Sequence, residues 1–185
     1  LHEVYKYWKG KTTSELATSY LAPETKTAME HNIFTPGNYF YNGVGHVTVC
    51  YGRIAREGLE SIKAQAAEAL SHCSFGDADY ARRTHFLQAV ILSCEAACVY
   101  AERYAALARS EAAACNDPVR RDELLKIAEN CDRVPRQGAR SFYEACQSFW
   151  FIQQLLQLES SGHSISPGRF DQYMYPFFKH DLDHG

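Results

Sequence analysis

The feature that most constrains the fold is a long run of apolar residues at helical spacing between Asp79 and Ala114. Apolar side chains recur there every three or four residues, a spacing that predicts one long helix with a narrow apolar stripe. The run ends at Asn116, Asp117 and Pro118, which predict a stop and a restart, because proline suits the first turn of a helix. The stripe consists of Phe86, Leu87, Val90, Ile91, Cys94, Ala97, Cys98, Ala101, Ala105 and Ala108.

The same period predicts further helices on both sides of the long one. One is expected from about Gly52 to Ser71, and a shorter one from Leu124 to about Cys131. Ser141 and a glutamate three residues later have the spacing of a capping box, which opens a helix running to Glu159. That helix is apolar nearly all round, so we expect it to be deeply buried. The residues from Arg169 to Phe178 predict an aromatic helix or turn.

The remaining segments predict irregular structure. The first 45 residues are aromatic and turn-rich, and predict loops with short helices. His46 to Tyr51 is β-branched and predicts a short extended segment, while Ser160 to Gly168 predicts a polar loop. No repeat or linker divides the chain. The expected fold class is therefore mainly α with one core.

Composition and charge exclude several classes of function. Apolar residues make up 46% and charged residues 22% of the 185 residues, which is typical of a globular domain. The net charge is −3 without a basic stripe, so we expect no nucleic-acid partner. No uninterrupted apolar run approaches the roughly 20 residues that cross a bilayer, so we expect no membrane partner.

The seven cysteines predict core packing rather than a metal site or disulfides. Their number is odd and no Cys-x-x-Cys pair occurs. Cys94 and Cys98 would share one helix face, but small apolar residues surround them, and free cysteine packs like a small hydrophobe. We therefore expect no bound metal, and a reducing, cytoplasmic compartment.

Two polar segments are candidate sites, since no phosphate-binding loop or HExxH or GxSxG motif is present. One is Glu159 to Pro176 (ESSGHSISPGRFDQYMYP), which follows an apolar helix; a purely structural polar loop would use the same residues. The other is Asn38 to Tyr51 (NYFYNGVGHVTVCY). Its histidine could equally be an ordinary core or surface residue without a catalytic role. The closing HDLDHG resembles a metal cluster, but a solvated, frayed terminus is the expectation there.

These segments carry a family resemblance that covers nearly the whole chain. The blocks YWKGKT, YNGVGHVTV, ERYAALA and RRDELLKIAENCDRVP occur in order, and are followed by ARSFYEACQSFWF and ESSGHSISPGRFDQYMYPFF. Together they resemble the glycyl radical, or pyruvate formate-lyase-like, enzymes, and in particular the dehydratase and lyase branch. The resemblance implies that residues 1–185 are the helical portion of an α/β barrel, which has ten strands in the intact family.

The family's radical chemistry implies residues that this chain lacks. A C-terminal glycine radical is installed by a radical-SAM activating enzyme, and passes to a cysteine that abstracts hydrogen, with a nearby glutamate as base. No matching cysteine loop or glycine motif occurs here, so no catalytic residue is assigned. The chain also starts at Leu1 and stops at Gly185. We therefore expect a partial domain that is inactive alone. The resemblance also implies that the intact enzyme is a homodimer.

The resemblance implies substrate contacts within this chain. Asn38 and His46 resemble the pair that hydrogen-bonds substrate hydroxyls in glycerol dehydratase, and Ser164 resembles the serine that assists them. Asp171 could contact a substrate cation, with an ion pair to an arginine as the alternative. Cys50 stands where an acidic or polar residue is expected, so the local match is imperfect.

The implied function is C–O bond cleavage in a small hydroxylated substrate, by thiyl-radical hydrogen abstraction. Alternatives in the same family are C–N cleavage of choline, dehydration of 4-hydroxyproline and C–C cleavage like that of formate acetyltransferase. A different class remains open, namely an inert helical binding module. A reading frame that continues past Gly185 into the cysteine loop and the glycine motif would favour the enzyme.

Overall fold

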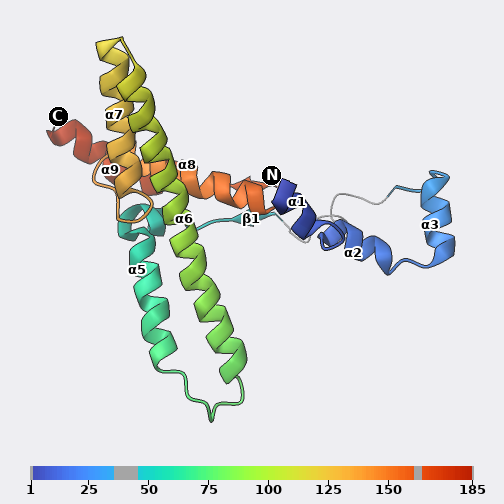
Figure 1. Cartoon of the computed structure of the whole chain (residues 1–185). Coiled ribbons are helices and arrows are strands. Elements are labelled where there is room, and N and C mark those ends of the chain that lie inside the picture. Colours follow the sequence, from blue (N-terminus) through green and yellow to red (C-terminus); the bar gives the residue numbers. More distant parts are fainter. Residues whose placement is uncertain (1, 36–45, 161–163, 185) are drawn as a thin grey trace. The chain divides into compact units, whose positions relative to one another are not determined.

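The computed structural model describes residues 2–35, 46–160 and 164–184, and it is mainly helical, as predicted (Figure 1). The chain divides into two compact units, one of residues 1–47 and 156–166 and the other of residues 48–155 and 167–185. Whether the whole chain is one domain of a larger protein stays a prediction. The elements are α1 (His2–Trp8), α2 (Thr13–Ser19), α3 (Pro23–Glu30), β1 (Val47–Thr48), α5 (Tyr51–Ser71), α6 (Tyr80–Ala114), α7 (Pro118–Arg133), α8 (Phe142–Glu159), β2 (Ile165–Ser166) and α9 (Phe170–His184).

The first unit consists of short helices and a small strand pair. Thr12 and Glu15 form a capping box at the start of α2, so this short helix begins at a defined residue. β1 pairs with β2, and the Val47 N–H donates to the Ser164 carbonyl at 3.4 Å. The predicted extended segment is thus confirmed for two residues, whereas Tyr51 already opens α5.

The second unit is organised by α6, which packs against α5 and α7 (Figure 1). The predicted long helix is confirmed to within one residue of its expected start. Its later alanines are buried and form the alanine seam, defined as Ala101, Ala105, Ala108 and Ala112. Ala101 and Ala105 of the seam pack with Cys131 of α7 and Phe151 of α8. The early part of the predicted stripe differs, because Phe86 is 67% exposed.

A glycine breaks α5 where a distant loop packs against it. Gly58 has φ +75°, and the freed Leu59 and Glu60 N–H groups donate to the carbonyls of Pro135 and Arg136 at 2.8 and 3.0 Å. A Cβ at Gly58 would lie 2.4 Å from the Arg136 oxygen. We call this junction of Gly58 with residues 135–139 the Gly58 clamp. It satisfies backbone donors that a continuous helix would have paired internally.

The expected deep burial of α8 is wrong for this chain. Its buried residues, among them Ala145, Ser148 and Phe151, occupy one face. Trp150 and Leu158 on the remaining surface are 52% and 69% exposed. The helix is apolar all round, yet neighbouring elements of the chain cover only part of it.

α9 extends further than the aromatic segment predicted. It runs to His184, so the expected frayed terminus is wrong for the described residues. The Lys179 ammonium pairs with the Asp183 carboxylate at 2.7 Å, and His184 Nδ1 lies 2.9 Å from the His180 carbonyl oxygen. These contacts span one helical turn, and so support the last turns of the helix.

The sequence-based expectation that no segment is apolar enough to cross a bilayer needs correction at α6. Among the described residues, this 35-residue helix meets the length and hydropathy of a membrane span, and 22% of that window is buried. Core helices of soluble proteins meet the same criterion, so the absence of a membrane partner stays a prediction.

Candidate functional site

The β1–β2 pair brings together the two polar segments that the sequence singled out. His46 directly precedes β1, and Ser164 directly precedes β2, so the hydrogen bond from Val47 to Ser164 places the two segments side by side. Both residues are exposed. A serine hydroxyl donates and accepts, and a neutral imidazole does the same through its two nitrogens, so the two side chains suit a hydroxylated ligand. Asn38, the third predicted residue, lies outside the described residues.

Asp171 belongs to the second compact unit. It lies in the first turn of α9 and is exposed. Among the described residues Asp171 makes no ion pair, so the alternative pairing with an arginine is not found there. Cys50 is exposed just before α5. Asp171 therefore remains a predicted substrate contact.

A tyrosine that the sequence reasoning missed holds the segment after β2. The Tyr173 hydroxyl donates to the Pro167 carbonyl at 2.8 Å. The next residue, Gly168, has φ +68°, and a Cβ there would lie 2.8 Å from Thr48 Cγ2. The spacing of aromatic residues in α9 gave no signal that distinguished Tyr173 from its neighbours. Only the three-dimensional contact identifies it.

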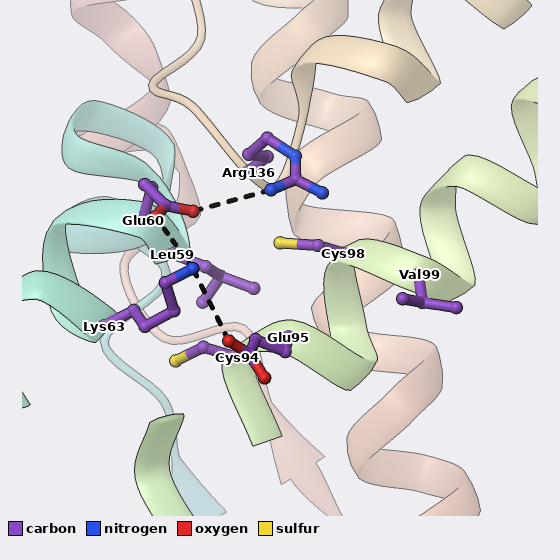
Figure 2. Close-up of a pocket in the computed structure, with 8 residues that line it drawn as sticks. All are labelled: Leu59, Glu60, Lys63, Cys94, Glu95, Cys98, Val99 and Arg136. Atoms are coloured by element: carbon purple, nitrogen blue, oxygen red, sulfur yellow. Dashed lines mark ion pairs between the residues drawn. The ribbon is translucent and has the colours of Figure 1, made fainter. Parts of the chain in front are cut away.

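A cavity of mixed charged and apolar lining, about 290 Å³ in volume, lies beside the Gly58 clamp (Figure 2). Its charged groups pair with one another: Lys63 lies 2.9 Å from Glu60 and 3.7 Å from Glu95. Figure 2 also shows Arg136 pairing with Glu60, at 3.5 Å. The lining residues are Leu59, Glu60, Lys63, Cys94, Glu95, Cys98, Val99 and Arg136. Each charged side chain that lines the cavity is paired with another one. These ion pairs link α5, α6 and the loop that contains Arg136, and they leave no unpaired charge for a ligand.

The two cysteines of this cavity are core residues, as predicted. Cys94 and Cys98 are buried, and burial raises the pKa of both thiols. A raised pKa keeps them neutral and unreactive at physiological pH. Among the described residues, no group of three or more His, Cys, Asp or Glu side chains is arranged to hold a metal ion.

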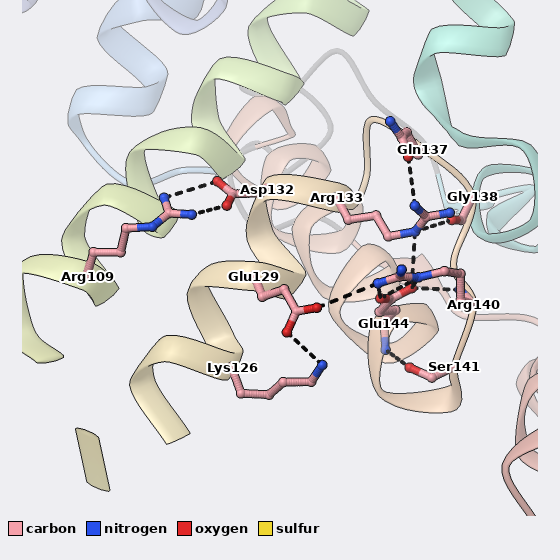
Figure 3. A network of polar contacts seen from close by, with 10 residues as sticks. All are labelled: Arg109, Lys126, Glu129, Asp132, Arg133, Gln137, Gly138, Arg140, Ser141 and Glu144. Atoms are coloured by element: carbon pink, nitrogen blue, oxygen red, sulfur yellow. Dashed lines mark hydrogen bonds and ion pairs between the residues drawn. The ribbon is translucent and has the colours of Figure 1, made fainter. Parts of the chain in front are cut away.

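Glu144 is the centre of a charged network at the start of α8 (Figure 3). Its carboxylate, 3% exposed, accepts from the Arg140 side chain at 2.7 Å and lies 3.4 Å from Arg133. Half of the predicted capping box is confirmed, since the Glu144 N–H donates to Ser141 Oγ at 3.2 Å. The carboxylate, however, accepts from the backbone N–H of Arg140, because the arginine charges draw it there. Burial raises the pKa of Glu144, but the hydrogen bonds and charge of Arg140 outweigh it and lower the pKa overall.

A second cavity of about 310 Å³ lies between α6, α7 and α8. It is lined largely by aromatic and aliphatic side chains, including Tyr104, Leu107 and Trp150. Trp150 and Leu107 are each 52% exposed, so the cavity opens on an apolar surface. Nothing in the described residues identifies a ligand for it.

Known proteins share this fold and its segments. The family model described as pyruvate formate lyase-like matches residues 1–185, and the chain belongs to this family. A solved structure from work on 1,2-propanediol dehydration in Roseburia inulinivorans is 60% identical with a TM-score of 0.85, over 97% of this chain and 22% of that one. The glycerol-bound B12-independent glycerol dehydratase of Clostridium butyricum is 51% identical with a TM-score of 0.84, over 100% of this chain and 24% of that one.

A curated relative extends the comparison to another substrate. The (2S)-3-sulfopropanediol dehydratase of Klebsiella oxytoca is 37% identical over 97% of this chain and 22% of its own length. The chain thus spans about a quarter of the length of the relatives it matches. Their names describe dehydration of small hydroxylated compounds, in agreement with the branch that the sequence resembles.

Proposed function

We propose that this chain is the part of a glycyl radical dehydratase that holds the hydroxyl groups of a small diol. The observation that carries the proposal is the β1–β2 pair, in which the Val47 N–H donates to the Ser164 carbonyl. This pairing joins the segment of His46 to that of Ser164, which are distant in sequence. The 60% identity with the structure from work on 1,2-propanediol dehydration supports a vicinal diol as substrate.

The chemistry assigned to this chain is binding and orientation. A neutral imidazole and a serine hydroxyl can hydrogen-bond adjacent hydroxyls, and a protonated imidazole assists the loss of water. Asn38 would complete the set of hydroxyl contacts, and Asp171 would contact a cationic group if the substrate carried one. A diol that loses water in this way yields an aldehyde and one water molecule.

The radical itself belongs to residues outside this sequence. In the proposed whole enzyme, a glycyl radical supplies hydrogen abstraction through a cysteine, and a separate radical-SAM enzyme installs it. None of the described residues is assigned a role in that step. The whole enzyme is proposed to be a cytoplasmic homodimer.

The test is an activity assay of the complete natural gene product with its activating enzyme under anoxic conditions. We expect propionaldehyde from 1,2-propanediol, with little or no product from choline or trans-4-hydroxyproline. Product from choline alone would show that the enzyme cleaves a C–N bond and would contradict a diol as substrate. A natural product that ends near Gly185 and turns over nothing would favour an inert helical module.

A matched pair of variants tests the site within that enzyme. His46→Gln removes the imidazole and should raise the KM for the diol by about ten-fold or more, as for loss of a polar contact in a closed site. His85→Gln changes an exposed histidine of α6 and should leave the KM unchanged. Equal KM values for the two variants would remove His46 from the site.

A further inference from the structure

Tyr173 connects the segment that leaves β2 to the start of α5. Its hydroxyl donates to the carbonyl of Pro167, the residue that directly follows β2, at 2.8 Å. Burial is the main cause that raises the pKa of Tyr173 to about 12, and the neighbouring Tyr51 adds to it. The hydroxyl is therefore protonated, and available as a donor, throughout the physiological pH range.

The ring of Tyr173 is fixed by the first turn of α5. A Cβ at Gly52 would lie 2.7 Å from the Tyr173 Cβ, so only glycine permits this approach. The ring also lies against Tyr51 and Phe170, with centroid separations of 6.4 and 5.7 Å. Since α5 begins three residues after β1, Tyr173 touches the segment that leaves β1 as well as the one that leaves β2.

A second close contact joins the same two segments. Gly168 has a backbone φ of +68°, and its missing Cβ would meet Thr48 Cγ2 at 2.8 Å. The chain after β2 therefore runs in contact with the last residue of β1. The glycine makes this approach possible, and the Tyr173 hydroxyl fixes the carbonyl immediately before it.

We infer that Tyr173 is a positioning residue, which holds Pro167 and thereby keeps the Ser164 segment paired with the His46 segment. The structural role of Tyr173 is independent of the proposed function, and only the expected effect on substrate binding rests on it. Removing the hydroxyl leaves the ring packed against Gly52 and releases Pro167, whose carbonyl then bonds to water. The strand pair loosens, and the two predicted hydroxyl contacts lose their fixed spacing.

The geometric part is tested by hydrogen exchange in the complete natural gene product, with Tyr173→Phe as the variant. The amide of Val47, which donates to Ser164, should exchange about five-fold faster, corresponding to the loss of one typical hydrogen bond. Tyr175→Phe makes the same chemical change at an exposed tyrosine of α9 and serves as the matched control. Unchanged exchange in Tyr173→Phe overturns the inference.

The functional part is tested by steady-state kinetics with 1,2-propanediol in the activated enzyme. Tyr173→Phe should raise the KM about five-fold with kcat within about two-fold of wild type, because it alters binding rather than chemistry. A fall in kcat at unchanged KM, or wild-type values for both, overturns the inference. If the wild-type enzyme converts no diol, the proposed function fails instead, and the exchange experiment still decides the role of Tyr173.

Discussion

The alanine seam and the Gly58 clamp both join helices of the second unit, but they do so in different ways. At the seam, α6 lies close to α7 along a row of buried alanines, and Ala101 and Ala105 pack with Cys131 of α7 and Phe151 of α8. At the clamp, one helix is interrupted, and its freed donors are satisfied by carbonyls of a distant loop. The seam is an extended contact between small side chains, whereas the clamp is a local contact between two backbone segments at Gly58.

This difference determines how each region responds to substitution. A small-residue contact can adjust by shifting side chains, so its cost grows gradually with added volume. At a contact between two backbone segments, an added side chain can be accommodated only if one of the backbone segments moves. We therefore expect the clamp to be the more sensitive of the two regions.

The largest effect is expected for Gly58→Ala. The added Cβ would lie 2.4 Å from the Arg136 carbonyl oxygen at a φ of +75°, so the clamp must open. The loss in the free energy of unfolding should be about 4 kcal/mol or more. Urea denaturation measures it. Gly10→Ala is the control, because Gly10 has φ +79° with nothing within 4 Å, and it should lose only about 1 kcal/mol.

Glu144→Gln tests the charged network next to the clamp. Removing a buried charge that pairs with Arg140 and Arg133 should cost about 2 to 3 kcal/mol at pH 7. The exposed pair of Lys179 and Asp183 provides the comparison, and Asp183→Asn should cost about 0.5 kcal/mol or less. Similar losses for both variants would show that burial does not matter here.

The same glutamate predicts a pH dependence. Its folded-state pKa is lowered, so its contribution to stability is present above the unfolded-state pKa and is lost as the pH falls through the folded-state value. Wild-type stability should therefore drop below about pH 4.5 more steeply than that of Glu144→Gln. Urea midpoints between pH 3 and 7 measure the difference, and parallel curves would contradict it.

A smaller effect is expected at the alanine seam. Ala105 is fully buried, and Ala105→Leu adds volume between α6 and its neighbours, at a cost of about 1 to 2 kcal/mol. Ala106→Leu places the same side chain on the exposed face of α6 and should change stability by less than about 0.5 kcal/mol. If Ala105→Leu cost as much as Gly58→Ala, the contrast between seam and clamp would be wrong.

The last prediction involves no change in stability and concerns the reactivity of two cysteine thiols. Burial raises the pKa of Cys131, which lies against the seam, to about 11, whereas Cys50 is exposed. Iodoacetamide at pH 8 should label Cys50 well before Cys131, because the thiolate is the reactive form. Peptide mass spectrometry over time measures the order, and early labelling of Cys131 would show that the seam opens.

The sequence predicted the helices and the seam because both depend on a local period. The long helix was predicted nearly to the residue, and its buried alanines lie in the predicted stripe except for Ala112, which the stripe did not include. The clamp could not be predicted, since Gly58 sits in an otherwise regular helical pattern and its partners come from another part of the chain. The exposure of Phe86 and Trp150 was missed for a related reason, because apolarity alone does not say which neighbours are present.

The candidate site was predicted only in part. His46 and Ser164 were identified by a family resemblance, and no pattern of spacing would have paired two segments so distant in sequence. Their pairing depends on the strands β1 and β2, each of two residues, which are too short to give a sequence signal of their own. Tyr173 shows the same limitation, because its role depends on a hydrogen bond to a backbone carbonyl.

The interruption of α5 also has a consequence for the order of folding. The amides of Leu59 and Glu60 sit at the start of a helical segment, yet their partners arrive only after α6 and α7 have folded back. The later half of α5 therefore gains its first turn through a long-range contact, which costs loop-closure entropy before it stabilises anything. Because this contact forms late, substitutions in the clamp should speed unfolding more than they slow folding, whereas those on the exposed face of α6 should do neither.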